Sequence, residues 1–112
     1  MAQLLISNGT LIDGRGGEPL AGASVLVEGD KIVAVAAAGE PLQVALDAEQ
    51  IDAGGDAILP GFIDAHVHVM FEIGKMEEAL NTPFSMKFYK AIGYLSKTLQ
   101  AGITSVRDAG GA

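Results

Sequence analysis

The chain has 112 residues, enough for one small domain with a modest hydrophobic core. Apolar residues make up 49% of it, which is typical of a globular protein, and its net charge of −7 argues against a basic surface for nucleic acid or anionic membrane. The absence of cysteine excludes disulfides and thiolate metal sites. No run is long and apolar enough for a membrane span, and no basic segment of a secretory signal opens the chain. We therefore expect a cytoplasmic protein that binds neither nucleic acid nor membrane.

The first sixty residues alternate short apolar runs with turn residues. Gly29-Asp30 separates two valine-rich runs by the two residues of a β-hairpin turn, and Asn8-Gly9 is another strong turn dipeptide. Pro60-Gly61 ends the last of these runs. The pattern predicts a small β-sandwich segment over residues 1–60. Its expected strands are residues 3–7, 10–12, 24–28, 31–36, 50–53 and 56–59.

The second half predicts a strand, a loop, a helix and a strand, which together form one βαβ unit with parallel strands. Residues 62–69 are the expected first strand, and residues 70–81 are the expected long loop, which could hold a short helical turn at residues 75–80. Thr82 is expected as the N-cap of the helix, Pro83 as its first helical residue, and Gly102 as the left-handed residue that ends it. The apolar residues at helical spacing, expected to pack against the sheet, are Phe84, Phe88, Ala91, Leu95 and Leu99.

Both histidines of the chain, His66 and His68, lie two residues apart in the first strand of this unit. Alternate residues of a strand share a face, so the imidazoles are expected side by side, with Cα atoms about 6.5–7 Å apart. Two imidazoles at that spacing can bind one cation through bonds of about 2.0–2.1 Å. The alternative is a pair of polar residues on a half-exposed strand. The opposite face is expected to be buried and consists of Ile63, Ala65, Val67 and Val69.

Carboxylates accompany the histidines. Asp64 shares their strand face, where it either accepts a hydrogen bond from a ligand imidazole or caps a neighbouring loop. Asp108 follows the second strand, where it either reaches the metal or pairs locally with Arg107 or a backbone amide. Functional residues of parallel α/β folds gather at these carboxyl ends of strands. The acidic residues of the loop, expected to form a solvated face or alternatively to gate a substrate, are Glu72, Glu77 and Glu78.

The histidine strand also carries a family resemblance. Residues 60–68, Pro-Gly-Phe-Ile-Asp-Ala-His-Val-His, resemble the signature of the amidohydrolase superfamily. Residues 25–35 are similar to the N-terminal β-segment of those enzymes, and residues 101–108 to their second barrel strand. Within the superfamily, the likeness is greatest to the imidazolonepropionase-like and prolidase-like metal-dependent peptidases.

The resemblance implies an α/β fold in which residues 1–60 form a β-sandwich segment and residues 61–112 begin a (β/α)8 TIM-type barrel. It also implies a divalent metal, usually zinc, with one or two ions in the complete enzyme and with His66 and His68 as two of the ligands. In the family, a carboxylated lysine, two further histidines and a catalytic aspartate follow on later strands. Such a barrel takes about 250 residues, so these positions, and with them the catalytic residues, are expected beyond Ala112.

The function implied is hydrolysis of amide or peptide C–N bonds, with small peptides such as Xaa-Pro dipeptides, or other small molecules, as substrates. The complete enzyme is expected to form a homo-oligomer, and the 112-residue chain, interpreted as its N-terminal part, is expected to be inactive. Two alternatives stay open. One is an imidazolonepropionase or a deaminase of the same superfamily, and the other is a non-catalytic, β-rich interaction fragment.

Overall fold

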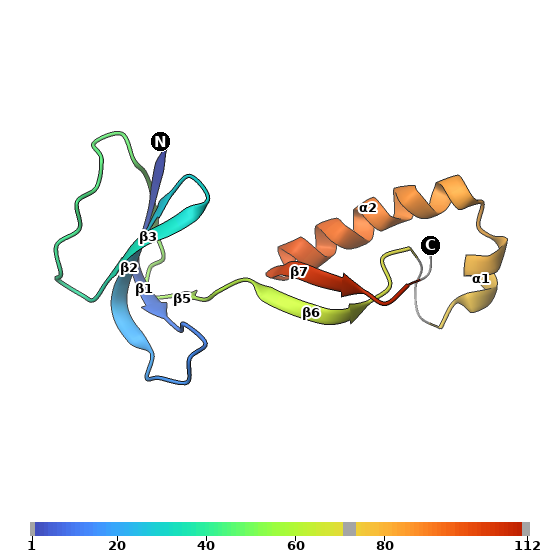
Figure 1. The fold of residues 1–112 in the computed structure, drawn as a ribbon, viewed down its shortest axis with the longest axis horizontal. Coiled ribbons are helices and arrows are strands. Elements are labelled where there is room, and N and C mark those ends of the chain that lie inside the picture. Colours follow the sequence, from blue (N-terminus) through green and yellow to red (C-terminus); the bar gives the residue numbers. More distant parts are fainter. Residues whose placement is uncertain (1, 71–73, 111–112) are drawn as a thin grey trace. The chain divides into compact units, whose positions relative to one another are not determined.

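The computed structural model describes residues 2–70 and 74–110, apart from the side chains of Met76 and Ala79. The chain divides into two compact units, residues 1–60 and residues 61–112 (Figure 1). The first unit is made of strands, and the second contains both helices of the described chain. The fold is therefore α/β, as the sequence predicts. None of the helices in the described ranges is long and apolar enough to cross a membrane.

The first unit is a five-stranded sheet in the order β3-β2-β1-β4, with β5 also paired to β1. β1 and β3 flank β2 in antiparallel pairs, whereas β4 and β5 run parallel to β1. The second layer of a sandwich does not lie among the described residues of this unit. The strands are β1 (Gln3–Leu11), β2 (Leu20–Glu28), β3 (Lys31–Ala36), β4 (Glu49–Asp52) and β5 (Ala57–Ile58).

The hairpin predicted at Gly29-Asp30 is confirmed. Glu28 of β2 pairs with Lys31 of β3, and Gly29 has a φ of 62°, which glycine adopts without a steric cost. The centre of the sheet is also the core of the unit, because β2 has a neighbour on each side. Its buried hydrophobic residues are Ala23, Val25, Leu26 and Ala36.

The turn predicted at Asn8-Gly9 is wrong, because β1 continues through both residues. Asn8 takes the left-handed conformation, with a φ of 57°, and the register with β2 shifts between Ile6 and Gly9, as in a β-bulge. The Asn8 side chain donates a hydrogen bond to Asp52 of β4, 3.0 Å away. A Cβ at Gly9 would collide with the side chain of Ile58 in β5, so glycine permits the close approach of that strand.

The second unit consists of two parallel strands, β6 and β7, with two helices between them in sequence. The predicted βαβ arrangement is confirmed, and the long helix α2 runs alongside the two strands (Figure 1). Its C-terminal end is tied to the sheet by Gly102, whose φ is 83° as expected and whose carbonyl accepts the N–H of Phe62 at 2.9 Å. The elements are β6 (Phe62–Val67), α1 (Met76–Asn81), α2 (Phe84–Gln100) and β7 (Ile103–Asp108).

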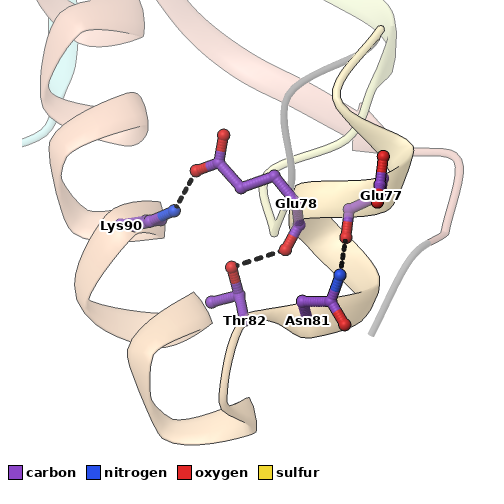
Figure 2. A network of polar contacts seen from close by, with 5 residues as sticks. All are labelled: Glu77, Glu78, Asn81, Thr82 and Lys90. Atoms are coloured by element: carbon purple, nitrogen blue, oxygen red, sulfur yellow. Dashed lines mark hydrogen bonds and ion pairs between the residues drawn. The ribbon is translucent and has the colours of Figure 1, made fainter.

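The junction between the helices corrects two predictions. The helical turn that residues 75–80 could hold is present as α1, whereas Thr82 is the C-cap of α1 rather than the N-cap of α2. The Oγ1 of Thr82 donates a hydrogen bond to the carbonyl of Glu78 at 2.8 Å (Figure 2). Pro83, expected as the first helical residue, is instead the N-cap of α2, without a side-chain capping bond. The junction is also held by an ion pair between Glu78 and Lys90, with 2.6 Å between Oε1 and Nζ (Figure 2).

The expected burial of the apolar faces in this unit is also wrong. Of the predicted helix stripe, Ala91 is buried, whereas the four large side chains are between 43% and 64% exposed. Ile63, on the strand face opposite the histidines, is 76% exposed. Helical spacing of apolar residues determines which residues share a face, but burial requires a second surface opposite that face. The exposed members of the stripe are Phe84, Phe88, Leu95 and Leu99.

Candidate metal centre

The two histidines meet at the carboxyl end of β6. His66 lies in the strand and His68 directly after it, and their Nε2 atoms are 3.3 Å apart. The ring centroids are separated by 5.2 Å and the ring planes cross at 74°. The imidazoles thus point the same ring nitrogen at a common place, with His66 exposed and His68 half-buried.

A backbone carbonyl determines which nitrogen of His68 carries hydrogen. Nδ1 of His68 lies 2.7 Å from the carbonyl oxygen of Gly110, beyond the end of β7. A carbonyl oxygen can only accept a hydrogen bond, so Nδ1 of His68 is the donor. In the neutral ring, Nε2 then keeps a lone pair, and this is the nitrogen that faces His66.

The distance between the nitrogens provides a test of whether the pair fits a metal ion. Two tetrahedral zinc–nitrogen bonds of about 2.0–2.1 Å place their nitrogens about 3.3–3.4 Å apart. The observed separation of 3.3 Å fits that geometry. Without a cation, the same pair is held by a hydrogen bond in which one Nε2–H donates to the other ring. The spacing of the two Nε2 atoms is therefore compatible both with a shared cation and with a direct hydrogen bond.

The two carboxylates next to the histidines act on the backbone. Asp64 accepts the N–H of His66 at 3.1 Å, so it caps the chain locally. Asp108 accepts the N–H of Gly110 at 2.8 Å, the local pairing that was one of its two interpretations. Sequence reasoning did not identify Gly110 as part of the site, because its contribution is a main-chain carbonyl and any residue type carries one.

The acidic residues of α1 lie on the surface. Glu77 and Glu78 are exposed, as expected of a solvated face, whereas Glu72 lies outside the described residues. The hydrogen bond and charge of Lys90 hold the pKa of Glu78 below its ordinary value, and Glu78 in turn raises the pKa of Lys90. Glu78 thus joins two helices.

The described residues do not by themselves form a complete coordination sphere. Among them, no group of three or more His, Asp or Glu side chains is arranged to hold a metal ion. A catalytic zinc site has three protein ligands and an open position. The histidine pair could supply two ligands of such a site.

Comparison with known proteins identifies the class to which this arrangement belongs. Residues 57–112 match the model of the amidohydrolase family, and the chain belongs to that family. It is 37% identical over 87 residues to an imidazolonepropionase of Streptomyces coelicolor, covering 78% of this chain and 21% of that protein. It is 36% identical over 105 residues to an adenine deaminase of Edwardsiella ictaluri, covering 94% of this chain and 15% of that protein.

Solved structures resemble the chain over nearly its whole length. A prolidase crystallised with N-methylphosphonate-L-proline matches 99% of this chain with a TM-score of 0.85 and 32% identity. A Xaa-Pro dipeptidase with methionine in its active site matches 97% of it with a TM-score of 0.82 and 27% identity. The chain spans 26% and 27% of the length of those two proteins, about a quarter of each.

Proposed function

We propose that this chain is the N-terminal part of a metal-dependent amidohydrolase that cleaves amide or peptide bonds, with Xaa-Pro dipeptides as substrates. The observation that carries the proposal is the convergence of two histidine Nε2 atoms, 3.3 Å apart, at the carboxyl end of the first parallel strand. Membership of the amidohydrolase family supports hydrolysis. The likeness to a prolidase and to a Xaa-Pro dipeptidase supports the choice of substrate.

In this proposal, His66 and His68 bind a divalent ion, zinc, through their Nε2 atoms, and the remaining ligands come from outside the described residues. When bound, the ion lowers the pKa of a coordinated water and polarises the scissile carbonyl. Because the Nδ1–H of His68 is held by Gly110, the lone pair of its neutral ring lies on Nε2. Both rings must be neutral to bind metal, so we expect affinity to fall in acid.

The proposal also assigns the parts of the chain. Residues 1–60 belong to a β-sandwich domain whose second layer comes from further chain, and residues 61–112 are the first strand-helix-strand of a TIM-type barrel. We expect a cytoplasmic, homo-oligomeric enzyme. Imaging of a fluorescently tagged protein would test its location, and size-exclusion chromatography with light scattering would test its oligomeric state. The reading frame is expected to continue beyond Ala112 with a lysine, two histidines and an aspartate at strand ends. A stop codon directly after Ala112 would contradict this assignment.

A second candidate is an imidazolonepropionase or an adenine deaminase. The sequence relatives at 37% and 36% identity carry those names, which favours this candidate over other members of the family. Both candidate functions would use the same histidine pair, so the pair cannot distinguish them. The difference between them would come from substrate-binding residues elsewhere in the protein.

One experiment separates the candidates. The protein encoded by the full reading frame is purified, stripped of metal, reloaded with zinc, and assayed with Xaa-Pro dipeptides, imidazolone propionate and adenine. We expect zinc-dependent hydrolysis of the dipeptides, and a loss of more than about 1000-fold in both His66→Ala and His68→Ala. Ser96→Ala, on the exposed surface of α2, is the matched control and should keep full activity. Turnover of one of the other two substrates alone supports the second candidate, and metal-independent turnover contradicts both.

A further inference from the structure

We propose that Asp108 is a positioning residue for the histidine pair. It folds the chain after β7 so that the carbonyl of Gly110 holds His68 in the Nδ1–H form. The functional consequence for metal binding rests on the function proposed above, whereas the effect on the ring of His68 does not.

The first step of the argument is the connection between the strands. Asp108, the last residue of β7, is the register partner of Val67, which lies between the two histidines. The next residue, Ala109, donates its N–H to the carbonyl of Val67 at 2.8 Å. The chain after β7 therefore begins its turn beside the histidine pair, at a position determined by the parallel ladder.

The second step is the turn itself. Oδ1 of Asp108 accepts the N–H of Gly110, two residues later, at 2.8 Å, which is the bond of an Asx turn. Gly110 has a φ of 113°, in the region that a side chain strongly disfavours. The bond from Gly110 to Asp108 thus stabilises one backbone conformation of Gly110 among the many that a glycine can adopt.

The third step is the direction of the Gly110 carbonyl. Its oxygen lies 2.7 Å from Nδ1 of His68, at the short end of the usual N–H···O range. The bond decides the tautomer of His68 and leaves the Nε2 lone pair facing His66. Partners of this kind orient metal-binding imidazoles, and their loss typically costs about 10–100-fold in metal affinity.

The action of Asp108 is geometric rather than electronic. Its carboxylate bonds to the N–H of Gly110, whereas His68 bonds to the carbonyl of Gly110, which belongs to the next peptide group. No proton or charge needs to pass between Asp108 and His68. An uncharged acceptor of the same shape should therefore replace Asp108, so Asp108→Asn is the conservative variant and Asp108→Ala the disruptive one.

The chain provides a matched control. Asp52, at the end of β4, also accepts the N–H of a glycine two residues later, with 2.8 Å between its Oδ1 and the nitrogen of Gly54. Gly54 is left-handed as well, with a φ of 59°. Asp52→Ala removes the same kind of bond from the first unit, which contains no histidine.

The test reads the tautomer directly by ¹⁵N NMR of the histidine-labelled 112-residue chain, at a pH of about 8.5, well above the ordinary histidine pKa. The sequence contains two histidines, so two ring systems appear. We expect His68 in the Nδ1–H form in the parent, in Asp108→Asn and in Asp52→Ala, and a mixture of tautomers in Asp108→Ala. An unchanged His68 tautomer in Asp108→Ala overturns the proposal, as does a mixture in Asp108→Asn.

Zinc titration of the parent and the same three variants, made in the protein encoded by the full reading frame, separates this inference from the proposed function. We expect zinc affinity to fall about 10–100-fold in Asp108→Ala and to stay within about 3-fold of the parent in the other two variants. A parent that binds no zinc, combined with the tautomer change, contradicts the metal site but supports the positioning role. Equal zinc affinity in Asp108→Ala and the parent overturns the positioning of a metal ligand. Backbone amide spectra establish whether each variant is folded. If Asp108→Ala does not fold, the tautomer of His68 in Asp108→Asn decides whether the positioning role holds.

Discussion

The first unit buries the centre of its sheet, whereas the second leaves most of its large apolar side chains exposed. In the first unit, β2 has a strand on each side and contributes Ala23, Val25 and Leu26 to the core. In the second unit, Met70 and Ala91 are the buried hydrophobic residues among those described, and Phe62 at the start of β6 is 55% exposed. The unit that carries the candidate site is thus the one with the smaller core.

This difference shows that hydrogen bonds, rather than burial in a large hydrophobic core, position the residues of the candidate site. Two hydrogen bonds position the histidine pair: the backbone N–H of His66 donates to the carboxylate of Asp64, and the ring Nδ1–H of His68 donates to the carbonyl of Gly110. These bonds need the β6–β7 ladder but no large core. The second unit exposes large apolar side chains on both β6 and α2, as faces that pack against a further layer do.

The largest expected effect is on metal binding in the second unit. His68→Ala removes one of the two converging nitrogens, and we expect zinc affinity to fall more than about 100-fold, beyond what loss of an outer hydrogen bond causes. Isothermal titration with zinc measures it. Asn81→Ala, on exposed α1, is the control and should bind zinc like the parent. Equal affinity in His68→Ala would show that the pair is not a metal site.

The next effect concerns the core of the first unit. Leu26 is 4% exposed, so Leu26→Ala should lower the free energy of unfolding by about 2–4 kcal/mol through lost burial and a cavity. Leu46 is fully exposed and serves as the control, so Leu46→Ala should change the free energy of unfolding by less than about 0.5 kcal/mol. Phe88→Ala, on the half-exposed stripe, should cost less than Leu26→Ala. Urea denaturation measures all three, and a larger loss in Phe88→Ala would reverse the comparison of the units.

A smaller effect is expected at the bulge in β1. In Gly9→Ala the new methyl group collides with the side chain of Ile58, which must shift, so we expect a loss of about 1–3 kcal/mol in the free energy of unfolding. Gly17→Ala, where nothing lies within 4 Å of the added Cβ, should be near neutral. Urea denaturation compares the two variants. Equal stability of both would mean that β5 does not approach β1 closely.

The smallest effect is expected at the ion pair between the helices of the second unit. Lys90 holds the pKa of Glu78 below its ordinary value, so the stabilisation is present above the ordinary carboxylate pKa and is lost as the pH falls through the lowered value. Lys90→Met should let the pKa of Glu78 rise towards its ordinary value, as carboxyl ¹³C NMR titration would show. Lys87→Met, one turn earlier on α2, serves as the control. An equal pKa of Glu78 in the two variants would argue against the Glu78–Lys90 ion pair in solution.

Local chemistry accounts for the parts of the fold that could be predicted. Gly29-Asp30 indicated a hairpin because a two-residue turn needs a left-handed residue, and Gly102 indicated the end of α2 for the same reason. Asn8 and Thr82 were misassigned because each has two local uses. Asn8 adopts the left-handed conformation inside a bulge as readily as in a turn, and Thr82 bonds back to Glu78 instead of forward to α2.

The sequence by itself determined the alternation of strands and helices, the family, and the placement of two imidazoles on one side of a strand, because strand periodicity is a local property. Only the tertiary structure decided which ring nitrogens converge and that the carbonyl of Gly110 orients His68, 42 residues away in the chain. A contact between a side chain and distant main chain leaves no mark in residue type. It exists because β6 and β7 lie in parallel, so their carboxyl ends meet.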